Sequence, residues 1–197
     1  MSDSGCLLYP LKSLLRPLDF GEVFGRCGEV EVELGCGDGS FLLRYAALNP
    51  GRNYLGIERL LGRISKIDRK GRRLGLVNLR GLRVEARYCL DYLLPRGGVS
   101  ALHVYFPDPW PKAKHARRRL VDATFPASVV RVLSLGGRVY LRTDDEAYWE
   151  QMGEAFAVEK RLRQVETPEE LAGVTTDFEE EFLAQGKPAR RWAFELC

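Results

Sequence analysis

The sequence has few of the residues that mark a secreted, zinc-binding or membrane protein. Its five cysteines are scattered without C-x-x-C spacing, which argues against a disulfide framework and a zinc site and suggests a reducing cytoplasm. No apolar run approaches the length of a bilayer span, so no transmembrane helix is expected. The first residues lack the basic segment and apolar core of a signal peptide, so a secretory leader is not expected either.

The marks of two other protein classes are also missing. The glycine loop does not have the G-x-G-x-x-G spacing of dinucleotide-binding proteins, and no hydride-transfer set of His or Tyr-x-x-x-Lys is evident, so a nicotinamide oxidoreductase is the least favoured reading. The two histidines, His103 and His115, are expected to be structural or close to phosphates. No zinc finger or recognition helix is apparent, and aromatic residues are sparse among the basic ones, which favours a folded RNA over duplex DNA as a partner.

The chain of 197 residues is long enough for one domain with a sizeable core. After a lead-in over residues 1–28, which is expected to be irregular or partly helical, strand-like and helix-like patterns alternate. Strands are expected at 29–34, 53–58, 79–86, 101–106, 137–143, near 158–165 and at 190–195. Helices are expected at 40–47, 59–75, 88–94, about 119–134 with an interruption or restart near Pro126, 145–157 and near 178–185. The alternation predicts an α/β Rossmann-like, doubly wound sheet of about seven mostly parallel strands, forming one domain over residues 29–197.

A glycine loop follows the first expected strand, in the sequence Glu33-Leu-Gly-Cys-Gly-Asp-Gly39. Gly35, Gly37 and Gly39 allow a tight turn and a close approach of the backbone to a ligand. Glu58 ends the second strand, 19 residues after Gly39, where a carboxylate can bind ribose hydroxyls. Glu33, directly before the first glycine, suits a cationic ligand such as an adenosyl sulfonium. Glu85, at the expected end of the third strand, is either an acceptor for an adenine amino group or a surface residue.

A stiff carboxylate follows the fourth strand, in the sequence Phe106-Pro-Asp-Pro-Trp-Pro. Proline fixes its own φ and favours extended backbone in the residue before it, so Phe106, Asp108 and Trp110 are expected to be extended and restrained. Ligands of such sheets bind beyond the carboxyl ends of the strands, which places Asp108 at the expected site. Trp110 offers a flat face for a base.

Positive charge is concentrated in the first part of the chain. Residues 1–143 contain 24 Lys and Arg against 13 Asp and Glu, whereas residues 144–197 contain 6 against 14. Residues 59–87 alone contain ten cations, and the segment after Trp110 adds Lys112, Lys114 and Arg117 to Arg119. Because arginine and lysine bind phosphate, this asymmetry indicates one face for a polyanion, most simply a nucleic acid.

These motifs resemble a known family. The glycine loop is similar to that of class I S-adenosylmethionine-dependent methyltransferases, and Phe106-Pro-Asp-Pro-Trp-Pro-Lys112 with its basic continuation resembles the signature of bacterial tRNA (guanine-N7-)-methyltransferases. Thr176-Asp177-Phe178-Glu179 is similar to a further motif of that family. The resemblance extends from about residue 29 to the C-terminus. It implies class I methyltransferase architecture, and methyl transfer from S-adenosylmethionine to N7 of guanine 46 in the variable loop of tRNA, with S-adenosylhomocysteine as the product.

The resemblance also implies roles for individual residues. Cofactor binding is expected from Glu33, Gly35, Gly37, Gly39, Glu58, Glu85 and Asp108; catalysis from Asp108; substrate binding from Lys112, Asp144, Thr176, Asp177, Phe178 and Glu179; and tRNA phosphate contacts from Lys114, Arg117, Arg118 and Arg119. Position 85 is commonly Asp in this family, so Glu85 could shift its contact by one methylene. The segment before the first strand is short, which puts in doubt any grip on RNA that a longer arm supplies elsewhere in the family.

The implied enzyme is cytoplasmic, a monomer or homodimer, and needs no metal or membrane. Two other functions stay open from the residues alone. A methyltransferase for a small molecule or a protein explains the glycine loop but leaves the basic residues without a role. A non-catalytic RNA-binding protein on a Rossmann-like fold explains the basic residues but predicts no binding of the cofactor.

Overall fold

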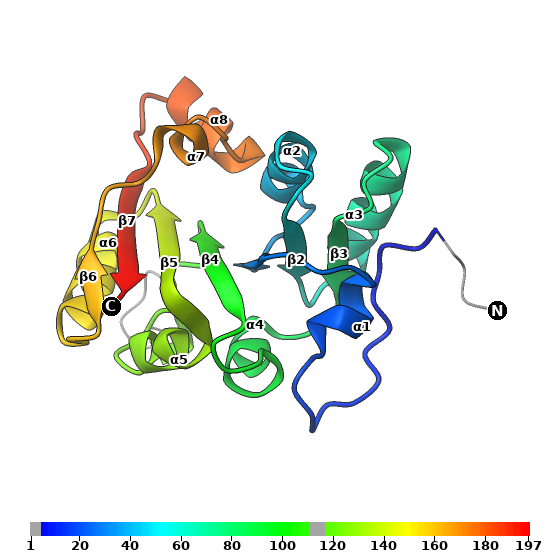
Figure 1. Cartoon of the computed structure of the whole chain (residues 1–197). Coiled ribbons are helices and arrows are strands. Elements are labelled where there is room, and N and C mark those ends of the chain that lie inside the picture. The colour runs from blue at the N-terminus through cyan, green and yellow to red at the C-terminus, as the bar shows by residue number, and fades with distance from the viewer. Residues whose placement is uncertain (1–4, 111–116) are drawn as a thin grey trace.

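The computed structural model describes residues 5–110 and 117–197. Seven strands form one sheet in the order β3-β2-β1-β4-β5-β7-β6 (Figure 1). The strands are β1 Val30–Leu34, β2 Asn53–Ile57, β3 Leu79–Leu82, β4 Val99–Tyr105, β5 Leu133–Thr143, β6 Leu162–Gln164 and β7 Arg190–Leu196. Neighbours from β3 to β5 pair in parallel, and β7 is antiparallel to both β5 and β6. The predicted fold class, a doubly wound sheet of about seven mostly parallel strands, is confirmed.

Helices cover both faces of the sheet. They are α1 Phe20–Phe24, α2 Ser40–Leu48, α3 Leu61–Arg73, α4 Ala86–Tyr88 with a π-helical turn over Cys89–Leu93, α5 Phe125–Val132, α6 Glu146–Ala157, α7 Glu169–Ala172 and α8 Asp177–Ala184. One apolar cluster joins the sheet to α1, the π turn, α5 and α6. A second cluster joins its other face to α2, α3 and α7.

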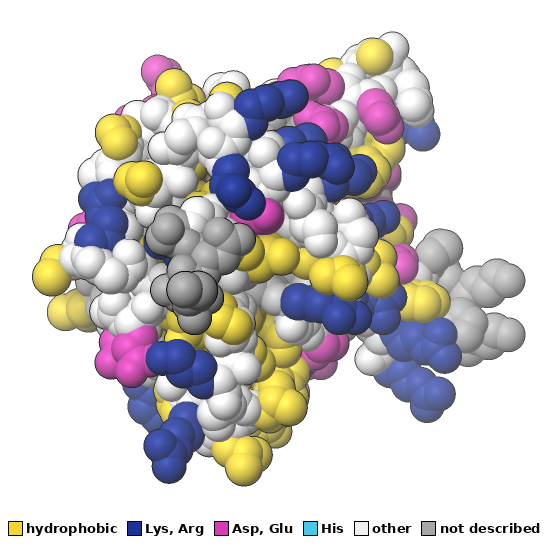
Figure 2. Space-filling model, turned by 90° about the vertical axis from the view of Figure 1, so that its right-hand side faces the viewer, with side chains coloured by type: hydrophobic (Ala, Val, Ile, Leu, Met, Phe, Trp, Pro, Cys, Tyr) yellow, Lys and Arg dark blue, Asp and Glu magenta, His cyan; other side chains and the backbone are white. Residues whose placement is uncertain are grey.

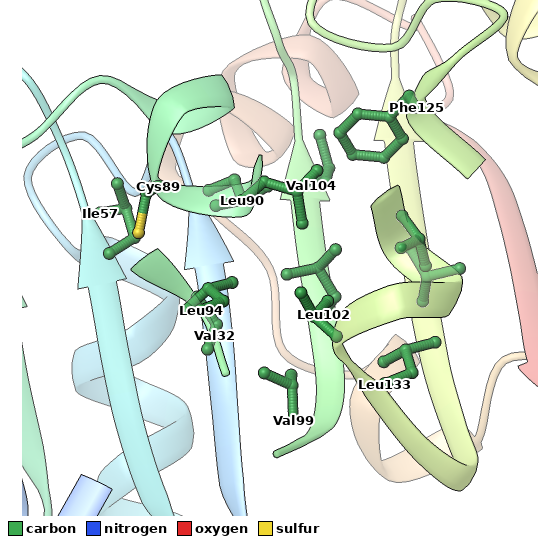
Figure 3. Packing of buried hydrophobic residues seen from close by; sticks show 14 of the residues in the cluster. Val32, Ile57, Cys89, Leu90, Leu94, Val99, Leu102, Val104, Phe125 and Leu133 are labelled. Atoms are coloured by element: carbon green, nitrogen blue, oxygen red, sulfur yellow. The ribbon is translucent and has the colours of Figure 1, made fainter. Parts of the chain in front are cut away.

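The first cluster is the larger part of the core. Figure 3 shows Leu102 and Val104 of β4 packed near Leu90 of the π turn and Phe125 of α5. All four side chains are fully buried. Burial of one such side chain contributes roughly 1.5–3 kcal/mol, so this layer fixes the sheet and thereby the position of its carboxyl edge.

Strand β1 explains how the site is built into the sheet. Val30, Val32 and Leu34 face the first cluster, as the alternating pattern predicts. Glu31 and Glu33 face the other side, and they are buried as well, with 3% and 4% exposed. Because β1 is a central strand with helices on both faces, its two glutamates are almost withdrawn from solvent, where a carboxylate oxygen without a partner costs free energy.

The residues before β1 pack along the edge of the sheet. Leu8 forms an isolated parallel bridge with Gly81 of β3. The Leu7 amide donates to Asp68 Oδ1 of α3 at 2.7 Å, and the Leu7 side chain is 5% exposed. The described part of the lead-in therefore contacts β3 and α3 through Leu7 and Leu8, and it contains the short helix α1, in agreement with the expected partly helical structure.

Several element boundaries differ from those expected. The third strand ends at Leu82 instead of Ala86, because the Glu85 side chain caps α4 through the amides of Arg87 and Tyr88. The helix expected at about 119–134 begins only at Phe125, which agrees with the expected restart near Pro126; that proline lies in the first turn, where proline is favoured. The strand near 158–165 is limited to Leu162–Gln164, and helix α7 was not expected.

Candidate active site

A cleft of about 780 Å³ lies at the carboxyl edge of the sheet, where the strand order reverses between β1 and β4. Parallel sheets bind ligands at this switch point because the neighbouring loops diverge there. Gly35, Glu58, Glu85 and Asp108 all line the cleft, although they follow four different strands. A smaller cavity of about 230 Å³, lined by Glu29, Arg52 and Arg138 among others, contains none of the predicted site residues.

The glycine loop has the shape that the sequence predicts. Gly35, Gly37 and Gly39 have φ angles of 76°, 56° and 80°, a region that other residues rarely adopt. A Cβ at Gly35 or Gly37 would meet no atom within 4 Å, whereas a Cβ at Gly39 would lie 2.5 Å from Ile67 Cγ1 of α3. The first two glycines thus leave space for a ligand, and the third allows close packing of the loop on α3.

Glu33 is an unusual carboxylate. It is 4% exposed, and its Oε2 atom has no hydrogen-bond partner within the described part of the chain. Burial raises the pKa of Glu33 to about 8, although the positive charge of Arg142 acts in the opposite direction. A buried carboxyl with an unpaired oxygen beside an open glycine loop fits a cationic ligand, and the cationic methionine part of S-adenosylmethionine is such a ligand.

Glu58 and Glu85 are both tied to backbone amides. Glu58 Oε1 accepts from the Leu60 amide at 2.8 Å at the start of α3. Glu85 accepts from the amides of Arg87 and Tyr88 at 2.9 and 2.6 Å. Glu85 is exposed, whereas Glu58 is 7% exposed. Both lie in the cleft at places where they can accept from a nucleoside, and Glu85 additionally serves as a helix cap.

Asp108 lies in a strained turn. Phe106 and Trp110 have φ angles of 49° and 41°, so the expectation that both are extended is wrong. Left-handed backbone at a bulky residue is costly, on the order of 1–3 kcal/mol, and such strain is typical of functional sites. The strain is held by local bonds: Asp108 Oδ1 accepts from the Trp110 amide at 3.1 Å, and Arg119 Nε donates to the Pro109 carbonyl at 2.6 Å. The side chain of Asp108 is exposed in the cleft.

The predicted phosphate-binding arginines divide into two groups. Arg117 and Arg118 are exposed and line the cleft, and the Arg118 guanidinium lies 5.0 Å from the centre of the Trp110 ring. Arg119 is partly buried, with its guanidinium over the Tyr148 ring and hydrogen-bonded to Pro109 and Gln151. These contacts give Arg119 a structural part in holding the turn. Lys112 and Lys114 lie outside the described residues.

The other predicted substrate residues lie directly after β5 or at the start of α8, and the cleft lining does not include them. Asp144 is exposed directly after β5. Thr176 caps α8 by accepting from the Glu179 amide at 2.9 Å, Asp177 pairs with Arg44 of α2 at 2.9 Å, and Phe178 is 51% exposed. Glu179 is 1% exposed and pairs with Arg142 and Arg191 at 2.8 and 2.6 Å.

Sequence reasoning missed several residues that shape the site. Asp38 of the glycine loop pairs with Lys70 of α3 at 2.8 Å, and Arg44 ties α2 to α8. Arg142 is a fully buried arginine within β5. A charged residue inside an otherwise apolar strand, Val139 to Thr143, was the available signal for Arg142. The other two pairs join distant segments and leave no local pattern.

Neither a metal cluster nor a membrane span is found in residues 5–110 and 117–197. No group of three or more His, Cys, Asp and Glu side chains there could hold a metal ion. None of the helices in these ranges combines the length and hydropathy needed to cross a bilayer.

Solved structures share this fold. A 30S ribosomal A1408 methyltransferase from an uncultured bacterium aligns with a TM-score of 0.63 and 15% identity, covering 93% of this chain and 98% of that one. The 16S rRNA methyltransferase KamB aligns with a TM-score of 0.60 and 20% identity, covering 90% and 92%. The predicted methyltransferase architecture is therefore confirmed at the level of the fold.

Sequence comparison with named proteins shows the family. Residues 28–192 match the family described as "Putative methyltransferase". A protein of Geobacter metallireducens named tRNA (guanine-N(7)-)-methyltransferase is 36% identical over 88% of this chain and 85% of the relative. Proteins of the same name from Syntrophotalea carbinolica and Thermotoga maritima are each 34% identical, over 89% and 87% of this chain and 78% and 55% of theirs. The resemblance carried by the sequence motifs is confirmed: the chain belongs to the tRNA (guanine-N(7)-)-methyltransferase family.

Proposed function

We propose that this protein is an S-adenosylmethionine-dependent tRNA methyltransferase that modifies N7 of guanine 46 in the variable loop. The observation that carries the proposal is one cleft lined by Gly35, Glu58, Glu85 and Asp108 together with Arg117 and Arg118. Groups suited to a nucleoside cofactor and groups suited to phosphate thus share a single cavity. The relatives from Geobacter metallireducens and Syntrophotalea carbinolica carry the name of this activity, and this chain covers 85% and 78% of their length.

The surface beside the cleft supports an RNA substrate. Arg59 and Arg63 line the cleft, and Lys66, Arg69 and Arg73 continue as exposed cations along α3. Figure 2 views the molecule from the side of α3 and shows Lys and Arg side chains spread over this face, with fewer Asp and Glu. A cationic surface next to a catalytic cleft binds the phosphates around a target base. A small-molecule methyltransferase has no use for such a surface.

The chemistry requires alignment more than proton transfer. When bound, S-adenosylmethionine supplies an electrophilic methyl group and leaves as S-adenosylhomocysteine. Guanine N7 has a free lone pair and no proton, so no residue has to act as a base to create the nucleophile. The protein must hold N7 about 3 Å from the methyl carbon and in line with the departing sulfur, with water excluded.

Asp108 has the charge and position for the catalytic role. The purine gains positive charge as the N7–carbon bond forms, and a carboxylate held near it stabilises that charge. Asp108 can also accept a hydrogen bond from the N–H edge of the guanine. Trp110, stacked with Arg118 at the same cleft, provides a platform for a base taken out of its stack.

The remaining assignments complete the proposal. Residues 29–197 form the methyltransferase domain and residues 1–28 its lead-in. Glu33 and the glycines bind the methyl donor, Lys112, Asp144 and the motif Thr176 to Glu179 serve the tRNA, and Lys114 with Arg117 and Arg118 contact its phosphates. The enzyme acts in the cytoplasm as a monomer or homodimer, without a metal.

The test is methyl transfer to bulk tRNA that lacks the modification, with a labelled donor and mapping of the product. We expect one 7-methylguanine, in the variable loop. Asp108→Asn should lower turnover by about 10²- to 10³-fold, the usual effect of losing one charge-stabilising group, while donor binding measured by calorimetry changes little. Glu150→Gln, which removes an exposed carboxylate of α6 outside the cleft, is the control and should retain full turnover. No 7-methylguanine with the native protein would refute the proposed function, and unchanged turnover of Asp108→Asn would refute its catalytic role.

A further inference from the structure

Arg142 is the largest fully buried side chain in the described part of the protein, with 2% exposed. Its guanidinium donates to the Val174 carbonyl at 2.8 Å, to the Leu171 carbonyl at 2.7 Å and to Glu179 Oε2 at 2.8 Å. All three acceptors lie in residues 169–184, the α7–α8 segment. One side chain of β5 therefore fixes that segment to the sheet at three points.

The same side chain lies beside the cofactor half of the site. Arg142 is paired in register with Tyr105 of β4, and its guanidinium lies 4.3 Å from the centre of the Tyr105 ring. Tyr105 lines the cleft. The Arg142 charge is close enough to Glu33 of β1 to lower the pKa of that buried carboxyl against the larger effect of burial. Arg142 thus pairs directly with Glu179, and its charge also acts on Glu33.

We propose that Arg142 is a positioning residue for methyl transfer, which holds the motif Thr176 to Glu179 at a fixed distance from the donor-binding carboxylate Glu33. The inference rests on the proposed function, because it assigns the motif to the tRNA and Glu33 to the methyl donor. Arg142 itself is too deeply buried to contact a nucleic acid. It acts through the backbone of the α7–α8 segment and through its charge.

The geometry requires arginine at this position. The three acceptors come from α7, from the turn after it and from α8. A planar guanidinium can reach them together, whereas a lysine ammonium acts as a point charge on a flexible stem. Glu179 retains its second partner, Arg191, whose side chain is 30% exposed, so loss of Arg142 leaves the α7–α8 segment attached but less precisely placed.

The experiment compares Arg142→Met and Arg142→Lys with Glu179→Gln. The matched control is Arg138→Met, which removes a more exposed arginine of the same strand whose partner is the partly buried Glu195. We measure kcat and KM for tRNA, the affinity for S-adenosylhomocysteine between pH 6 and 9 by calorimetry, and hydrogen exchange of residues 169–184. Thermal unfolding of each variant shows whether it is folded at the assay temperature.

We expect Arg142→Met to raise the KM for tRNA at least tenfold and to speed hydrogen exchange in the α7–α8 segment. Loss of the positive charge should also shift the pH midpoint of ligand binding upward, because ionising Glu33 becomes harder. Arg142→Lys should keep the pH midpoint and recover part of the KM. Glu179→Gln should raise KM without moving the midpoint, and Arg138→Met should change neither.

Several outcomes would overturn the inference. Native KM and native pH midpoint in Arg142→Met would do so, as would equal effects in Arg138→Met. If Arg142→Met is unfolded, the test rests on Arg142→Lys. A native KM for tRNA together with native hydrogen exchange in Arg142→Lys refutes the positioning role. If the native protein does not methylate tRNA, the proposed function fails separately, and the calorimetric pH profile and hydrogen exchange still test Arg142.

Discussion

The glycine-loop region and the α7–α8 segment each bury one glutamate, and the two glutamates have opposite surroundings. Glu33 is 4% exposed and has an oxygen without a hydrogen-bond partner in the described part of the chain. Glu179 is 1% exposed, and both of its oxygens accept from arginines. A buried carboxylate without partners weakens the folded state, whereas a fully paired one is part of the framework. Glu33 is therefore suited to binding a ligand, whereas Glu179 holds the α7–α8 segment in place.

The largest effect is expected from breaking the paired glutamate. Glu179→Ala leaves Arg142 buried without its carboxylate and should destabilise the protein by about 3–5 kcal/mol, the usual result of removing one partner of a buried ion pair. Denaturant unfolding measures this change. Arg163→Ala, which removes the exposed arginine of the Arg163–Glu195 pair, should change stability by less than about 1 kcal/mol and is the control. Equal losses for the two variants would show that Glu179 does not form part of the framework.

The opposite change in stability is expected when Glu33, whose Oε2 atom has no partner in the described part of the chain, is replaced. The pKa of Glu33 is raised from 4.5 to about 8 in the folded protein, so the folded state binds a proton that the unfolded state releases between these two values. The resulting loss of folding stability is absent at pH 4, grows as the pH rises and reaches its full size above about pH 8. Glu33→Gln should therefore stabilise the ligand-free protein by roughly 2–4 kcal/mol at pH 8 and by nothing at pH 4.

The same variant should lose its ligand. At pH 7 the Glu33 carboxyl is mostly protonated, and a cation bound beside it should expel close to one proton. Calorimetry of S-adenosylmethionine binding in buffers of different ionisation enthalpy measures that proton. Glu33→Gln should release none and bind more weakly. If Glu33→Gln is more stable but binds the ligand with native affinity, Glu33 does not take part in ligand binding, and it does not differ from Glu179 in the way described above.

A smaller effect is expected within the glycine loop. Gly39→Ala must adopt a φ near 80° and bring its Cβ within 2.5 Å of Ile67 Cγ1, which should cost about 2–3 kcal/mol. Gly136→Ala has a φ of 74° but no atom within 4 Å, so it should cost only about 1 kcal/mol for the backbone. The additional substitution Ile67→Ala removes the close contact, so it should restore part of the stability lost by Gly39→Ala and none of that lost by Gly136→Ala. Equal losses at Gly39 and Gly136 would mean that the contact with α3 does not shape the loop.

The sequence by itself determined the order of the strands and of most helices, and it brought out several of the residues that meet at the cleft. Apolar periodicity distinguishes strands from helices, glycines and prolines mark the loops, and parallel strands bring Gly35, Glu58 and Asp108 to one edge by topology alone. These are local signals, and together with the tendency of β-α-β units to cross over right-handedly they predict the place of a site. Two local expectations were wrong. The third strand was expected to continue past Glu85, but that side chain caps α4. Phe106 was expected to be extended because a proline follows it, but its φ is 49°.

Only the tertiary structure decided what each charged residue does. Glu31 and Glu33 look like the solvent face of a strand, and their burial follows from the helices that cover β1. Arg119 resembles its neighbours Arg117 and Arg118 in sequence, but it holds the Pro109 turn because Gln151 and Tyr148 of α6 lie beside it. Arg142 and Glu179 are separated by 37 residues, and their pairing depends on how the α7–α8 segment folds back onto the sheet. Burial and partner choice depend on contacts between distant segments, which no local pattern records.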